Sequence, residues 1–91
     1  MADARHLHDL KSLFERKRLY LGLSRTVKAL KAGRIAKVYM ASNTPKEVKS
    51  DLTYYGMLSG AEIVLLEQPN KELGIAVRKP FPISVIGVVK E

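Results

Sequence analysis

The sequence predicts an α/β protein, a three-layer α/β/α sandwich with a central sheet of about four strands. Segments with helical apolar spacing alternate with short, buried-looking apolar runs, and only a few residues connect them. A chain of 91 residues has room for one compact core. We therefore expect residues 1–91 to form a single domain with the element order αβαβαβαβ.

The first half of the chain carries the signals of two helices and two strands. An amphipathic apolar stripe predicts a helix over about 5–17, and a short extended piece follows at 19–21. Gly22 interrupts this piece, and helical spacing then continues to Gly33, which should end the second helix in a left-handed conformation. The apolar run at 37–41 is rich in β-formers and predicts a buried strand.

The third helix has a recognisable start signal. Thr44 is expected to provide the capping hydroxyl, Pro45 to occupy the first helical position and Glu47 to return the capping hydrogen bond. The helix should end at Gly60. Its predicted buried stripe consists of Val48, Leu52, Tyr55 and Leu58.

The end of the chain predicts one more helix between two strands. The run at 63–66 is typical of a strand, and Asn70 is expected as the N-cap of a short helix. Pro80 and Pro82 exclude a helix in the segment that follows. The last segment, 83–89, is almost wholly apolar, so we expect a central strand that is covered on both faces.

Positive charge is concentrated in one part of the chain. Residues 1–50 hold twelve Lys and Arg against four acids, whereas residues 51–91 hold four against five. The stretch 16–37 contains eight cations and no acid. Such a distribution favours a polyanionic partner, above all a nucleic acid and less often an anionic membrane surface.

The composition argues against several other classes of protein. Without cysteine there can be no disulfide, thiolate nucleophile or cysteine-ligated zinc. No apolar run approaches the ~18 residues of a membrane span, and the first ten residues lack the apolar core of a secretory signal, so we expect a cytoplasmic protein.

Motifs for catalysis are also missing. His6 and His8 are two residues apart, which on a helix points them to different sides, and no third metal ligand is evident. Neither a nucleophile elbow nor a phosphate-binding glycine loop occurs. We expect no enzyme activity, no metal and no cofactor.

The segment that begins at Gly22 has the features of an anion site. A helix that starts here directs free N–H groups and the positive end of its dipole outward. Arg25 and Lys28 lie one turn apart on one side, and Ser24 and Thr26 add short hydroxyls. The alternative is an ordinary helix with a solvated basic face.

Several short motifs, in order along the chain, resemble the kink-turn RNA-binding (L-seven-Ae-like) superfamily of archaeal and eukaryotic ribosomal proteins, and most closely its L-thirty-e branch. The resemblance covers about 11–89 and implies an α/β/α sandwich that grips sharply bent rRNA as a component of the large ribosomal subunit, with a monomer as the default state. The motifs lie at 21–30, Gly33, 41–45, 54–55, 57–59, 72–74 and Phe81.

The resemblance also implies which residues contact RNA, in four segments. The start of the second helix would enter the RNA groove beside tandem G·A pairs, an asparagine after the next strand would contact RNA, a later loop would pack on a flipped-out nucleotide, and an aromatic residue would approach a base. These positions are Gly22, Leu23, Ser24, Arg25, Thr26 and Lys28; Asn43; Gln68, Asn70, Lys71, Leu73 and Gly74; and Phe81. The alternatives are an ordinary turn residue for Asn43 and a core residue for Phe81.

The chain departs from the family pattern in ways that leave other functions open. Ser24 and Arg25 stand where the most general kink-turn binders have asparagine and glutamate, and Arg78 stands where the closer branch has glycine. One alternative is a kink-turn protein of another RNA particle, such as a guide-RNA or ribonuclease P complex. The other is a protein-interaction module with an acidic partner.

Overall fold

The computed structural model describes residues 4–90, and of residues 4–9 it describes the backbone alone. The side chains of His6 and His8, for which no metal site is predicted, therefore lie outside the described residues. Within the described chain the elements are α1 (Ala4–Glu15), β1 (Leu19–Leu21), α2 (Leu23–Lys31), β2 (Ile35–Met40), α3 (Lys46–Ser59), β3 (Glu62–Leu65), α4 (Asn70–Ala76) and β4 (Val85–Val89). The predicted order of elements is confirmed, with β2 starting two residues earlier than expected.

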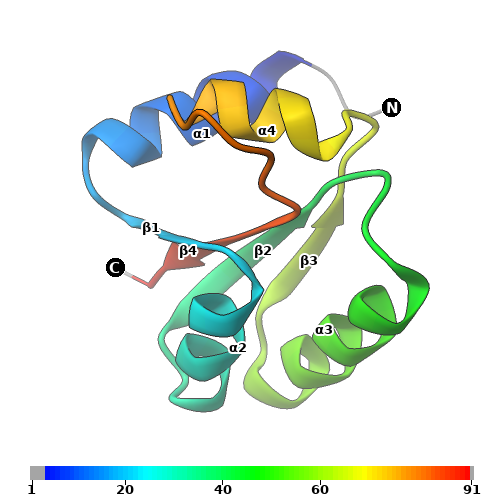
Figure 1. Ribbon diagram of the computed structural model, residues 1–91. Coiled ribbons are helices and arrows are strands. Elements are labelled where there is room, and N and C mark those ends of the chain that lie inside the picture. The colour runs from blue at the N-terminus through cyan, green and yellow to red at the C-terminus, as the bar shows by residue number, and fades with distance from the viewer. Residues whose placement is uncertain (1–3, 91) are drawn as a thin grey trace.

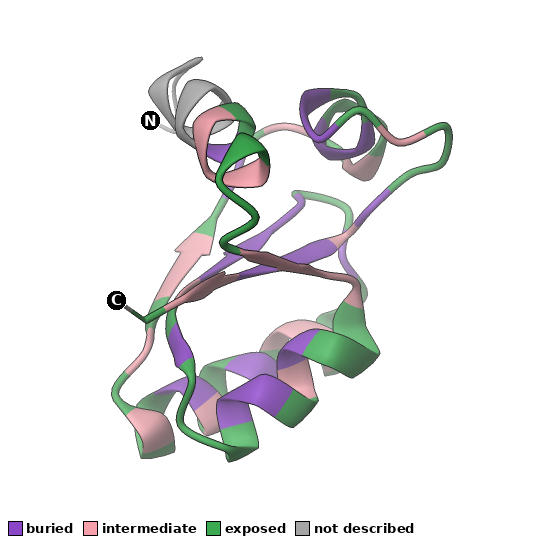
Figure 2. Cartoon of the chain, turned by 90° about the vertical axis from the view of Figure 1, so that its left-hand side faces the viewer, coloured by how far each residue is buried: buried purple, intermediate pink, exposed green. Residues whose placement is uncertain are grey.

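The elements form the predicted three-layer sandwich (Figure 1). The strand order is β1-β4-β2-β3, in which β4 is antiparallel to β1 and β2, and β2 is parallel to β3. Helices α1 and α4 cover one face of the sheet and α2 and α3 cover the other, as the edge-on view of the sheet in Figure 2 also shows. The last strand is central, as predicted.

The two central strands divide their side chains between two cores. Tyr39 and Ile86 belong to the core under α1 and α4, whereas Val38 and Val85 belong to the core against α2 and α3. Neighbouring residues of a strand point to opposite faces, so a strand that is covered on both sides must be apolar throughout. This explains the continuous apolar run of β4.

All four helices end in the same kind of turn, in which one residue adopts a left-handed conformation. These residues are Lys17 (φ 58°), Gly33 (φ 72°), Gly60 (φ 77°) and Arg78 (φ 57°). In each turn the next N–H donates to a carbonyl five residues back, for example from Lys79 to Gly74 at 2.9 Å. The predicted helix ends at Gly33 and Gly60 are confirmed. The positive φ at position 78 also explains why the closer family branch has glycine there, since glycine adopts this conformation without strain.

Replacing Arg78 by glycine is expected to raise the free energy of unfolding by about 0.5–1 kcal/mol, because glycine adopts this conformation without the strain of a Cβ atom. The change also removes a solvent-exposed ion pair with Glu15 (3.6 Å), which contributes little. Urea denaturation of the parent, Arg78→Gly and Arg78→Ala measures the effect, since the alanine variant removes the charge but keeps the Cβ atom. Equal stability of the two variants would contradict the backbone explanation.

The predicted cap of the third helix is wrong. Thr44 is buried, and its hydroxyl donates to the carbonyl of Ala41 (2.8 Å) and lies 3.3 Å from that of Ser84. Helix α3 begins at Lys46, with Pro45 at the N-cap and no side-chain capping bond. A buried hydroxyl takes the nearest carbonyl, so Thr44 joins the end of β2 to the start of β4 instead of capping a helix.

The outer face of α3 is more apolar than predicted. Leu58, expected in the buried stripe, is 69% exposed, and Tyr54 and Met57 beside it are also exposed. Leu52 is fully buried, and Val48 and Tyr55 pack against the same core, so the predicted stripe is confirmed for these three residues.

Candidate nucleic-acid interface

The segments predicted to contact RNA converge at one end of the sheet. Strands β1 and β2 are both antiparallel to β4, and β3 is parallel to β2, so the carboxyl ends of β1, β2 and β3 share one edge. Backbone hydrogen bonds connect the segments there: Gly22 N–H donates to the Val85 carbonyl (2.8 Å) and Ser42 N–H to the Gln68 carbonyl (2.9 Å). Loops that are far apart in the sequence thus form one surface.

Gly22 sets the direction in which α2 leaves the sheet. Its backbone has φ 96° and ψ 162°, a combination that essentially only glycine adopts. It is the N-cap of α2, and no side chain accepts a hydrogen bond from the first turn. The exposed side chains of Ser24 and Arg25 follow directly. The free amides, the helix dipole and the guanidinium together give this helix start the chemistry that suits a phosphate group.

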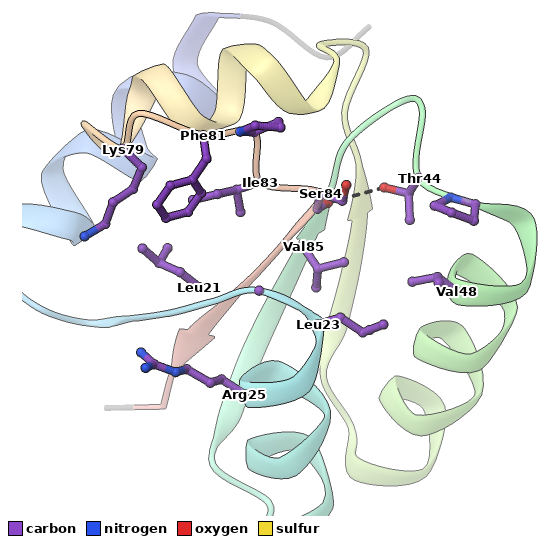
Figure 3. Close-up of a pocket in the computed structure, with 13 residues that line it drawn as sticks. Leu21, Leu23, Arg25, Thr44, Val48, Lys79, Phe81, Ile83, Ser84 and Val85 are labelled. Carbon is purple, nitrogen blue, oxygen red and sulfur yellow. Dashed lines mark hydrogen bonds between the residues drawn. The ribbon is translucent and has the colours of Figure 1, made fainter.

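A cleft of about 680 Å³ opens beside this helix start (Figure 3), and we call it the Phe81 cleft. Lys79 and Phe81 project from the segment before β4 and lie across from Leu21 and Arg25. The side chain of Phe81 is 54% exposed, so it is not a core residue. The lining residues, none of them acidic, are Leu21, Gly22, Leu23, Arg25, Thr44, Pro45, Val48, Lys79, Phe81, Pro82, Ile83, Ser84 and Val85.

This lining suits an unstacked base next to a phosphate. An exposed aromatic ring offers a stacking surface, and cations at the rim can hold the backbone of the same nucleotide. The volume falls in the range of about 300–1,000 Å³ that small-ligand sites occupy.

Asn43 and Asn70 form a link between two loops of the interface. The Asn43 Nδ2 group donates to Asn70 Oδ1 (3.1 Å), and the Asn70 backbone N–H donates to Asn43 Oδ1 (3.0 Å). The Asn70 carbonyl accepts from the N–H of Ile83 (3.0 Å), which leads into β4. Asn70 is therefore the first residue of α4 and not its predicted N-cap; the amide of Asn43 caps the helix from another loop. Asn43 is exposed, and an amide with these two hydrogen bonds has a second N–H and a further lone pair to offer to a ligand.

The predicted site residues fall into three groups by exposure. Seven residues are exposed at or beside the interface: Leu23, Ser24, Arg25, Lys28, Asn43, Lys71 and Phe81. Three are partly exposed, namely Gly22, Gln68 and Asn70, and three are buried, namely Thr26, Leu73 and Gly74.

Thr26 and Leu73 are 0% exposed, so the side chains of these two predicted site residues do not reach the surface of the interface. Thr26 faces β4 at Gly87, and its hydroxyl donates to the Tyr20 carbonyl (3.4 Å), while Leu73 belongs to the core under α4. Both residues position the exposed members of their motifs.

Lys79 is a functional candidate that the sequence motifs do not indicate. It lines the Phe81 cleft, and its Nζ atom lies 5.6 Å from the centre of the Phe14 ring, a cation–π contact that holds it near the rim. A signal in the sequence is its place two residues before Phe81, in a segment that Pro80 and Pro82 keep out of a helix.

The chain is similar to proteins of a ribosomal family. A family model described as "Ribosomal protein L7Ae/L30e/S12e/Gadd45 family" matches residues 5–91. The chain is similar to the large ribosomal subunit protein eL30 of Saccharomyces cerevisiae, with 40% identity over 77% of this chain and 67% of that protein. The eL30 of Sulfolobus acidocaldarius is 35% identical over 91% of this chain and 80% of that protein. The chain thus spans about two thirds of the length of the yeast relative and more of the archaeal one.

Solved structures show the same fold. A protein of unknown function from Bacillus halodurans C superposes with a TM-score of 0.88 at 24% identity, over 97% of this chain and 87% of that one. The Giardia lamblia 15.5kD RNA binding protein gives a TM-score of 0.85 at 21% identity, over 93% of this chain and 71% of that one. The family model and the eL30 relatives establish that the chain belongs to the ribosomal protein L7Ae/L30e/S12e/Gadd45 family.

Proposed function

We propose that this protein is an RNA-binding structural component of the large ribosomal subunit that recognises a sharply bent, kink-turn-like rRNA element. The observation that carries the proposal is the Phe81 cleft, where an open helix start, two cations and an exposed aromatic ring face the same space without an acidic residue. The relatives named as large ribosomal subunit proteins support the ribosomal role.

In this proposal, three parts of the interface have different roles in binding RNA. The start of α2, with Arg25 and Lys28, binds phosphates and enters the groove of the bent RNA, because its amides and cations are exposed. Phe81 stacks on a base that the bend leaves unstacked. The link between Asn43 and Asn70 fixes the loops before RNA arrives, which lowers the entropy lost on binding.

The test compares binding to a short kink-turn RNA and to a straight duplex of equal length, titrated at several salt concentrations. We expect the bent RNA to bind at least about tenfold more tightly, which corresponds to about 1.4 kcal/mol. Arg25→Ala should lower the log–log salt slope by roughly 0.7–0.9 for each phosphate that the guanidinium neutralises in the parent. Phe81→Ala should weaken binding of the bent RNA by about 1–3 kcal/mol, the range for a stacked base.

Tyr54→Ala is the matched control for Phe81→Ala, since Tyr54 is a similarly exposed aromatic residue (58%) that does not line the Phe81 cleft. It should leave the preference for bent RNA unchanged. Equal binding of both RNAs, insensitive to Arg25→Ala and Phe81→Ala, would contradict the proposed mechanism.

We further propose that residues 1–91 act as one RNA-binding domain, as a monomer within the ribosomal particle and in the cytoplasm. None of the helices within residues 4–90 is long and apolar enough to span a membrane.

A panel of unrelated kink-turn RNAs distinguishes a protein that binds only its ribosomal site from one that binds kink-turns in general. We expect selective binding, because Arg25 places a donor where general binders have an acceptor.

A further inference from the structure

We infer that a second hollow, on the β1 side of α2, binds one unstacked nucleotide of a single strand that leaves the bent RNA element. We call it the Tyr20 hollow; its volume is about 480 Å³, and its lining residues are Tyr20, Arg25, Lys28, Ala29, Ala32 and Arg34. The inference rests on the proposed RNA-binding function and extends the RNA contact beyond the Phe81 cleft.

The lining combines an apolar floor with an uncompensated positive rim. Ala29 and Ala32 contribute only methyl groups, so a flat ligand can approach the helix closely, and Tyr20 provides an aromatic wall. The ion pairs among residues 10–90 involve Lys37 with Glu62 and Arg78 with Glu15, and none of the three cations of the hollow takes part. An anionic ligand therefore needs to displace no acidic side chain of residues 10–90.

Arg25 connects the two binding surfaces. It lines both the Phe81 cleft and the Tyr20 hollow, and Figure 3 shows it projecting from α2 away from Thr44 and Val48 on the far side of the cleft. A phosphate on this guanidinium thus lies between the two spaces. A strand that leaves the cleft past Arg25 enters the hollow next.

The positive surface continues to the opposite end of the sheet. Helix α2 has nine residues, about 13 Å of helix, and Arg34 follows its last turn. The Arg34 carbonyl accepts from the N–H of Lys90 (2.8 Å), and the Arg18 carbonyl accepts from the N–H of Val89 (2.9 Å), so the backbone brings two more cationic residues, Lys90 and Arg18, to the end of the hollow. The strand can therefore follow cations along the whole length of α2.

The apolar floor distinguishes a single strand from a duplex. The bases of a duplex are stacked inside it, so a duplex would reach only the cations and leave Ala29, Ala32 and Tyr20 without a partner. An unpaired nucleotide places its base on the floor and its phosphates on the rim, which is the combination that single-strand binding sites use.

The test uses a blunt kink-turn RNA and the same RNA with a single-stranded extension of about eight nucleotides at the 5′ or the 3′ end. We expect one of the two extensions to tighten binding at least about fivefold, the lower end of the stacking range. An extension made of abasic nucleotides should lose most of this gain. Arg34→Glu should abolish the gain and leave binding of the blunt RNA within about twofold, because Arg34 lines only the hollow.

Lys31→Glu is the matched control, with the same change of charge three residues earlier, in the last turn of α2. Its Nζ atom lies over the Tyr55 ring (5.1 Å), on the side of α2 that faces α3 and not the hollow. It should keep the gain from the extension. Equal effects of the two charge reversals, or an abasic extension that binds as well as the normal one, would overturn the inference.

Three further outcomes distinguish a failure of this inference from a failure of the proposed function. If the blunt kink-turn RNA binds more tightly than a straight duplex but neither extension adds affinity, the hollow is not a nucleotide site and the proposed function stands. The dissociation constant of free adenosine monophosphate is measured on the complex of the protein with the blunt RNA. If adenosine monophosphate near that concentration removes the gain in affinity from the extension, the hollow binds soluble nucleotides and the single-strand inference is wrong. If bent and straight RNA bind equally, the proposed function itself fails.

Discussion

Replacing Gly74 by alanine is expected to lower the free energy of unfolding by about 1–3 kcal/mol and to weaken binding of kink-turn RNA, although Gly74 itself is buried. A Cβ atom at this position would collide with the carbonyl oxygen of Phe81 and lie 3.2 Å from its carbonyl carbon and 3.4 Å from the Cα atom of Pro82. These are backbone atoms, which cannot rotate away. The segment that carries Phe81 has to move, and the stacking surface moves with it.

Gly56→Ala is the control, because Gly56 also lies inside a helix and is buried. Its added Cβ atom would meet the side chain of Ile63, with Cδ1 at 2.5 Å and Cγ1 at 2.9 Å, and the far end of this side chain can turn. The better helix propensity of alanine, about 1 kcal/mol, favours both variants equally. We expect Gly56→Ala to change stability less and RNA affinity not at all. Urea denaturation and RNA titration of the folded variants measure both effects, and unchanged RNA affinity of Gly74→Ala would show that the position of Phe81 is unimportant.

The order of the elements could be read from the sequence because local signals determine it. The period of the apolar residues changes at each boundary, and Gly33 and Gly60 end their helices as their residue type predicts. The capping assignments at Thr44 and Asn70 failed because both residues also have partners from other parts of the chain. The partner of Thr44 is Ser84, 40 positions away, and the partner of Asn70 is Asn43, 27 positions away. A local sequence pattern cannot predict such distant pairs.

The candidate site could be predicted as a set of segments but not residue by residue. Arg25 and Thr26 are adjacent in one motif, yet a helix turns by about 100° between them, so one is exposed and the other faces β4. The same holds for Lys71 and Leu73 in α4. A family motif contains the residues that contact the partner and those that position them, and only the packing distinguishes the two. The place of Arg34 in a binding surface could not be predicted for a different reason: the Tyr20 hollow forms only when β1 lies beside α2.

Replacing Gly22 by alanine tests whether the direction of α2 controls RNA recognition. The φ and ψ angles of Gly22 strain any residue with a Cβ atom by about 1–3 kcal/mol, although no neighbouring atom lies within 4 Å of the added methyl group. The strain can be relieved only by a backbone rotation at this position. That rotation disturbs the hydrogen bond from the Gly22 N–H to the Val85 carbonyl (2.8 Å) and shifts the first turn of α2. We expect a loss of stability of this size and at least about a tenfold loss of affinity for kink-turn RNA.

Gly33→Ala separates the loss of stability from the loss of binding. Gly33 also has a positive φ (72°) and free space around it, but it lies at the other end of α2, away from the Phe81 cleft. Alanine there should lower stability by about 1–2 kcal/mol, the strain of a left-handed residue with a Cβ atom. The folded Gly33→Ala variant should bind kink-turn RNA as tightly as the parent. The Gly22→Ala variant should bind it more weakly, even where the two variants are equally stable. If both variants bind RNA as the parent does, the start of α2 is not held in place for RNA by Gly22; if both lose binding equally, stability and not helix direction limits recognition.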